Sequence, residues 1–127
     1  MNIKQSKIVR AYKALEKTSG QKLPLKISHK LWSLAKLLEP HVNYQKEKEQ
    51  EVLDKYGKFM NADGSFNFKD EETMRAFAEE MNDTIDRAGE EDVELIDYEK
   101  VVLKTDSGLE LSIEDIDALS DFVEFEE

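Results

Sequence analysis

One long helical pattern covers residues 28–56 and sets the dimensions of any fold that this chain can adopt. Pro40 lies inside the pattern, and its missing backbone donor predicts a kink or a break there. The later QKEKEQE stretch is polar on every side, so it is either solvated or covered by another chain. The sequence therefore predicts a long, kinked helix with few apolar residues in its second half. Its apolar positions are Leu31, Leu34, Ala35, Leu38, Val42, Val52, Leu53 and Tyr56.

Capping signals mark the start of this helix and the end of the one before it. Ser28 is the expected N-cap of the long helix, with Ile27 and Trp32 spaced for a hydrophobic staple. An earlier helix has an apolar stripe and a basic opposite side, and Gly20 is its expected stop. The stripe of this first helix consists of Ile8, Ala11, Tyr12 and Leu15.

Two more helices are predicted nearer the C-terminus. Asp70 opens a helix over residues 70–89, which Gly89 ends. Ser112 and Asp115 resemble a capping box at the start of a short final helix. The expected buried stripe of the helix over residues 70–89 is Met74, Phe77, Ala78, Met81 and Ile85.

Turn-forming residues predict two short β segments between these helices. The stretch FMNADGSFNF alternates about an Asp-Gly pair, which is typical of a tight β-hairpin. The stretch VELIDYEKVVLKTDSGLEL is β-like, with Asp-Ser-Gly as its turn. The predicted fold is mainly α with a minor β component: a kinked long helix packed with two or three shorter helices, plus one or two small β-hairpins. We expect a single domain over residues 1–127, made of a helical part over 1–58, a hairpin insert over 59–69, a helix over 70–89, and a β-hairpin with an acidic C-terminal helix over 90–127.

The net charge of −11 conceals a gradient along the chain. Counting Lys and Arg against Asp and Glu gives +8 for residues 1–38, −6 for 39–89 and −13 for 90–127. Opposite ends attract each other, either within one molecule or between copies arranged head to tail. Self-association as a homo-oligomer is therefore one expectation.

The residues that most enzymes need are not assembled in this sequence. Asn61, Asp63 and Gly64 invite comparison with a calcium loop, but Phe59 would occupy its first ligand position and the final glutamate is missing. The two histidines lack zinc-ligand spacing, there is no cysteine, and neither a nucleophile elbow nor a glycine-rich phosphate loop occurs. We predict no catalytic residues, no metal and no cofactor, so the protein is not expected to be an enzyme.

Two further classes of partner are disfavoured. The N-terminus has no apolar signal region and no apolar run is long enough to span a membrane, so a soluble, intracellular protein is expected. The basic side of the first helix lacks interleaved aromatic residues and belongs to a molecule of charge −11, so direct nucleic-acid binding is not expected. A protein partner remains.

The acidic C-terminal stretch has two interpretations. Glu114, Asp117 and Asp121 follow helical spacing on one side, opposite Ile116, Leu119 and Val123. They form either a docking face that mimics an anionic ligand or a face that is solvated or neutralises the basic first helix. Both interpretations remain open at this point.

Several stretches together resemble a small family of unknown function encoded by phages and prophages of Gram-positive bacteria. They are AYKAL, LPLKIS, LLEPHVNYQKEKEQEVLDKYG and LELSIEDIDALSDFVE, and the likeness extends over residues 11–124. The resemblance implies a viral gene product that acts in the host bacterial cytoplasm, and it supplies no catalytic residues. The functional hypothesis is a non-catalytic protein-binding module, namely an acidic inhibitor of a host defence nuclease of the anti-CRISPR or anti-restriction type. The alternative is an accessory protein or chaperone of virion tail or head assembly.

Overall fold

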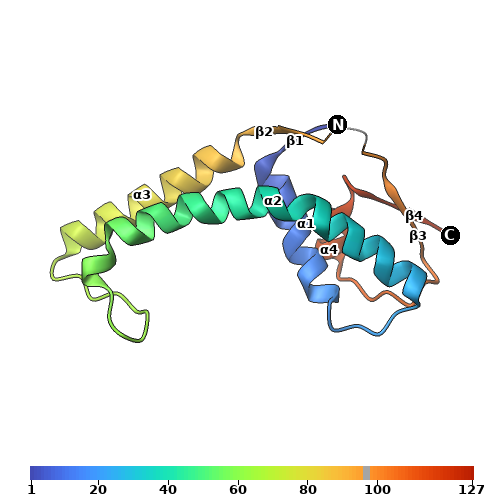
Figure 1. Cartoon of the computed structure of the whole chain (residues 1–127), viewed down its shortest axis with the longest axis horizontal. Coiled ribbons are helices and arrows are strands. Elements are labelled where there is room, and N and C mark those ends of the chain that lie inside the picture. The colour runs from blue at the N-terminus through green and yellow to red at the C-terminus, as the bar shows by residue number, and fades with distance from the viewer. Residues whose placement is uncertain (96–97) are drawn as a thin grey trace.

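A small head and a projecting two-helix arm make up the computed structural model, which describes residues 1–95 and 98–127 (Figure 1). The helices are α1 (Gln5–Thr18), α2 (Leu25–Lys55), α3 (Glu71–Gly89) and α4 (Ile113–Leu119), with a 3-10 turn η1 (Gly57–Phe59). The strands are β1 (Asn2–Lys4), β2 (Asp92–Glu94), β3 (Val101–Lys104) and β4 (Val123–Glu126). The predicted fold class, mainly α with a minor β component, is confirmed.

Helix α2 connects the two parts, because its first half lies in the head and its second half forms one side of the arm (Figure 1). Its 31 residues correspond to a length of about 46 Å. The helix remains continuous through Pro40, so of the two predicted outcomes, a kink or a break, the break does not occur. Its axis nevertheless changes direction near the middle, as the kink prediction requires (Figure 1). In the turn that contains Pro40, the backbone carbonyl of His41 accepts a 2.6 Å hydrogen bond from the Gln5 side chain.

The predicted start of this helix is also wrong. α2 begins at Leu25, directly after Pro24, and the backbone N–H of Ser28 already donates to the Pro24 carbonyl at 3.0 Å. Ser28 therefore lies in the first turn and cannot act as the N-cap. Proline restricts its own φ and needs no donor at a helix entrance, so Pro24 starts the helix one turn earlier than serine would. Trp32 is 56% exposed, and the staple built on Ser28 is not formed.

The head core forms where α1 packs between α2 and α4. The ring of Phe122 is completely buried there, and Tyr98 lies across it in an edge-on contact of 5.9 Å between ring centroids. The Tyr98 hydroxyl donates to the Phe122 backbone carbonyl, and burial raises the Tyr98 pKa to about 12. Other residues of this core are Ile8, Ala11, Leu15, Leu34, Leu38, Leu103 and Leu119.

Two separate two-stranded sheets connect distant parts of the chain. β1 pairs antiparallel with β2, placing Ile3 opposite Val93, and β3 pairs parallel with β4, placing Leu103 opposite Phe125. The hairpin predicted about the Asp-Ser-Gly turn is therefore wrong, because β3 pairs with β4 and residues 109–112 form no strand. Residues 96–97 of the predicted hairpin lie outside the described residues.

The turn after β3 explains why no hairpin forms. The backbone N–H of Ser107 donates to the backbone carbonyl of Lys104, and Gly108 adopts a φ of 88°, as expected of a turn. The chain after this turn is held by Gln21 instead of returning along β3. The Gln21 amide donates to the Glu110 carbonyl at 2.8 Å and accepts from the Glu110 N–H at 3.0 Å.

The arm consists of the second half of α2 and α3, which run antiparallel and are joined at the tip by residues 56–70 (Figure 1). The predicted helix over residues 70–89 is confirmed, and Asp70 caps it by accepting the Thr73 N–H at 2.7 Å. The predicted hairpin insert reduces to one antiparallel bridge between Met60 and Phe66. Gly64, with a φ of 87°, occupies the turn of this bridge.

Candidate functional site

The acidic C-terminal residues turn toward α1. Arg10 donates to the Asp117 carboxylate at 2.7 Å, and Lys17 donates to Asp115 at 3.1 Å. Lys7 lies 4.0 Å from Asp121. This arrangement neutralises basic side chains of the first helix, which was one of the two interpretations of the acidic stretch.

The common helical face expected for Glu114, Asp117 and Asp121 is not formed. α4 ends at Leu119, so Asp121 lies beyond the helix in the turn before β4. Glu114 is exposed in the first turn of α4, and no salt bridge joins it to another described residue. Ser112 caps this helix as predicted, because its hydroxyl accepts the Asp115 N–H at 3.1 Å. Protein binding by the three acids stays a prediction.

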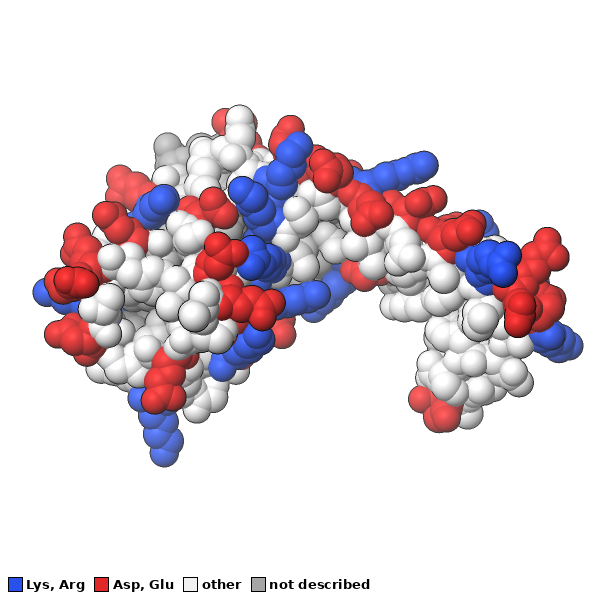
Figure 2. Space-filling view, turned by 180° about the vertical axis from the view of Figure 1, so that it is seen from behind, with Lys and Arg blue, Asp and Glu red and all other residues white. Residues whose placement is uncertain are grey.

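The arm carries many acids that form no ion pair among the described residues. Residues 45–91 contain fourteen Asp and Glu against seven Lys and Arg, a net charge of −7. Within this segment, residues 71–91 hold eight acids and two arginines, a net charge of −6. Among the described residues, Glu80 is the only acid of α3 in an ion pair. Figure 2 shows the acidic side chains following one edge of the arm, beside a broad uncharged surface.

An apolar stripe follows one side of the arm. The sequence predicts that the stripe of α3 is buried, but Met74 is 51% exposed and Ala78 is also exposed. The prediction of a fully buried stripe is wrong, because α3 packs mainly against α2 and approaches α1 near Gly89, at its C-terminal end. We define the stripe face as Leu53, Met74, Ala78, Met81 and Ile85.

A groove of about 380 Å³ opens at the base of this face, between α1 and the arm. Its apolar walls are Val9, Tyr12, Val42 and Ile85, with Lys13, Glu16, Lys46 and Glu49 among the charged lining residues. We call it the inner groove. Gln45 also lines it, is only 7% exposed, and has a side-chain oxygen without a hydrogen-bond partner among the described residues. An unpartnered buried polar atom is rare in native folds and costs stability unless something binds it.

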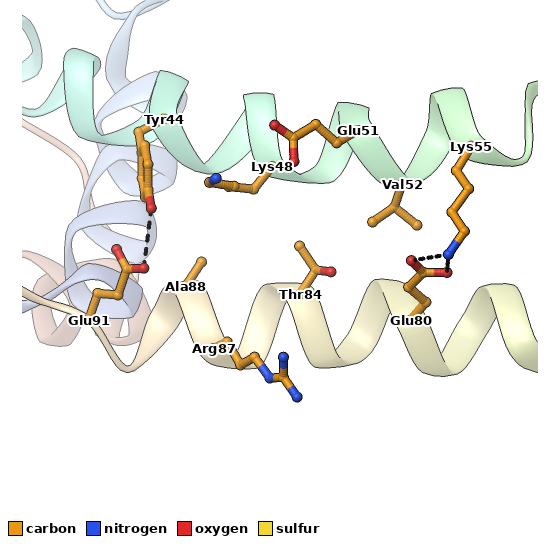
Figure 3. A pocket seen from close by; sticks show the side chains of 10 residues that line it. All are labelled: Tyr44, Lys48, Glu51, Val52, Lys55, Glu80, Thr84, Arg87, Ala88 and Glu91. Carbon is orange, nitrogen blue, oxygen red and sulfur yellow. Dashed lines mark hydrogen bonds and ion pairs between the residues drawn. The ribbon is translucent and has the colours of Figure 1, made fainter.

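The opposite side of the arm holds a second groove of about 370 Å³, across which two pairs of polar side chains meet (Figure 3). Lys55 donates to both carboxylate oxygens of Glu80 at 2.9 and 3.1 Å, and the Tyr44 hydroxyl donates to Glu91 at 3.2 Å. The hydrogen bonds from Lys55 and from the Tyr56 hydroxyl lower the pKa of Glu80. Figure 3 shows Arg87 pointing away from α2. These contacts hold α2 and α3 together.

Aromatic rings close the tip of the arm. Tyr56, Phe59, Phe66, Phe68 and Phe77 form a cluster with ring centroids 5.0 to 6.4 Å apart. All five rings are only partly buried. The cluster explains how a loop with a single bridge keeps its shape far from the head core.

The loop that invited comparison with a calcium site is held by its own hydrogen bonds. Asp63 accepts from both the N–H and the hydroxyl of Ser65, at 3.0 and 2.6 Å, and these bonds lower the Asp63 pKa. Within residues 1–95 and 98–127, no group of three or more His, Cys, Asp or Glu is placed to hold a metal ion. None of the helices in these ranges is long and apolar enough to cross a membrane.

Comparisons of the chain with protein-family models, curated proteins and solved structures find no match. A function for this chain therefore has to be inferred from the residues of the arm. The sequence alone did not reveal the inner groove, because its walls come from three separate helices. One signal was present: Gln45 falls three residues after Val42 and seven before Val52, on the side where the apolar stripe of α2 continues.

Proposed function

We propose that this chain is a non-catalytic protein-binding module whose arm is the docking element. The observation that carries the proposal is the row of acids on α3 beside the exposed stripe face. Among the described residues, Glu80 is the only acid of α3 with an ionic partner, whereas Asp115, Asp117 and Asp121 of the C-terminal stretch meet bases of α1. Unpaired acids beside an exposed apolar stripe favour a basic protein surface as the partner.

The favoured role is that of an acidic inhibitor, encoded by a phage and acting in the host bacterial cytoplasm on a defence nuclease. Nucleases present basic surfaces to the phosphate backbone of their substrates, and an acidic arm competes for such surfaces. The resemblance to phage-encoded proteins supports this setting.

The second candidate is a chaperone of virion tail or head assembly. The partly exposed Met74 and Met81 side chains support it, because methionine adapts to partners of different shape. The two roles differ in salt dependence. Binding led by charge weakens steeply as ionic strength rises, whereas binding led by apolar burial does not.

Affinity capture from phage-infected cells of a Gram-positive host, followed by mass spectrometry, tests the proposal. The captured protein is then purified, and its association rate is measured in low and high salt. A basic partner with a salt-sensitive association rate supports inhibition, and a virion protein with a salt-insensitive rate supports the chaperone role. Failure of every captured protein to bind after purification overturns both.

A further inference from the structure

We infer that the stripe face and the inner groove together seat a basic amphipathic helix of the partner. The inference rests on the proposed function and assigns the binding mode. The partner helix lies along the arm with its apolar side on the stripe face. One large apolar side chain of that helix enters the inner groove as an anchor.

The spacing of the stripe matches that of a helix-packing seam. Met74, Ala78, Met81 and Ile85 follow one another at intervals of four, three and four residues. This alternation is the heptad pattern that places apolar side chains against a second helix. From Met74 to Ile85 the stripe is about 16 Å long, which accommodates about three turns of a partner helix. Small Ala78 in the middle lets the partner backbone approach closely.

Charge selects a basic helix over a second copy of this chain. On α3, helical periodicity places four charged residues beside the stripe, on the side of the helix that points away from α2. They are Glu71, Glu79, Asp86 and Arg75. Two copies packed stripe to stripe would bring together two segments over residues 71–91, each of charge −6. The two acidic segments would repel each other at such close approach. Lysines and arginines that flank the apolar side of a partner helix are instead attracted to the acids of α3.

The walls of the inner groove specify the anchor. Val9, Tyr12, Val42 and Ile85 form apolar walls that suit a large side chain. Tryptophan has a large apolar ring system and fits this requirement.

The first test uses a fluorescein-labelled amphipathic peptide of Leu, Lys and one Trp, with about eighteen residues or five helical turns. Its acidic counterpart carries Glu in place of each Lys. Fluorescence anisotropy should show binding of the basic peptide and none of the acidic one. Binding of both peptides alike, or no binding of the basic peptide, overturns the inference. If the basic peptide does not bind but the protein forms a dimer that Ala78→Lys disrupts, the occupant of the stripe face is a second copy of this chain.

Two exposed alanines of α3 supply a matched pair of variants. Ala78 lies in the stripe, whereas Ala76 lies two residues away on another side of the helix. Ala78→Lys should lower the affinity for the basic peptide at least tenfold, roughly the effect of truncating one important interface residue. Ala76→Lys makes the same change in charge and should lower it only slightly. Equal losses of affinity in the two variants would mean that net charge alone attracts the peptide. That result would overturn the inference that the stripe face binds it.

A peptide with Ala in place of Trp tests the anchor. It should bind about tenfold more weakly than the Trp peptide, roughly the effect of truncating one important interface residue. Equal binding of the two peptides overturns the anchor. A natural partner whose binding ignores Ala78→Lys leaves the proposed function intact and overturns this inference alone.

Discussion

Arg10 and Asp117 lie 107 residues apart in the sequence, and their side chains meet at 2.7 Å. With Lys7–Asp121 and Lys17–Asp115, this ion pair attaches the acidic end of the chain to the basic first helix. Charges that motivated head-to-tail association thus find partners within one molecule. Self-association itself stays a prediction, which light scattering in low and high salt tests.

The first prediction concerns the three acids singled out from the sequence. Replacing Glu114, Asp117 and Asp121 with serine should lower the free energy of unfolding by about 1 kcal/mol, because exposed ion pairs contribute little each. Urea denaturation in low and high salt measures this loss, which should shrink as salt screens the pairs. Unchanged stability combined with weaker partner binding would instead support the docking role of these residues.

A second prediction concerns acid pH. The Lys17 hydrogen bond is the main cause of the lowered Asp115 pKa, and the Ser112 hydroxyl adds to it. A carboxyl with a lowered folded-state pKa contributes stability above its unfolded pKa and loses that contribution as pH falls through the folded value. Asp115→Asn should therefore flatten the fall in melting temperature between about pH 5 and about pH 2. Glu114→Gln, one residue away and exposed, is the control and should leave the fall unchanged.

Local signals were sufficient to predict the helices. The apolar spacing of α1, α2 and α3 and the caps at Asp70 and Ser112 depend on residues within a turn or two, so the sequence reveals them. Strand partners depend on contacts across the whole chain. Ile3 opposite Val93 and Leu103 opposite Phe125 are pairings that no local pattern specifies.

The errors at the candidate site have the same origin. Phe122 and Val123 continue a helical apolar pattern after Leu119, so Asp121 was assigned to the same helix as Glu114. In the fold, Phe122 enters the core and Val123 begins β4. Conversely, periodicity predicts which side of α3 is apolar but not whether anything covers it. Exposure of Met74 follows from the arm having only two helices.

A third prediction compares the two parts of the molecule. Phe122→Ala should lower the free energy of unfolding by about 3–5 kcal/mol, because it empties a fully buried site in the head. Met74→Ala should change it by only about 0.5 kcal/mol, since that side chain is half exposed on the arm. Chemical denaturation of both variants measures the difference. Similar losses would show that the stripe face is covered in solution.

The last prediction asks which acidic group attracts the partner. Replacing Glu79, Asp83 and Asp86 of α3 with serine changes the net charge by the same three units as the C-terminal triple variant. None of these three acids takes part in an ion pair with another described residue, so folding should be nearly unaffected.

Association with the partner should slow, and its salt dependence should fall, because steering charges act mainly on the association rate. The C-terminal triple variant should lose stability but keep the association rate per folded molecule. Stopped-flow association in low and high salt, measured on both variants, separates the two acidic groups. The opposite result would be a wild-type association rate for the arm variant and a slower rate for the C-terminal variant. It would support Glu114, Asp117 and Asp121 as the docking residues.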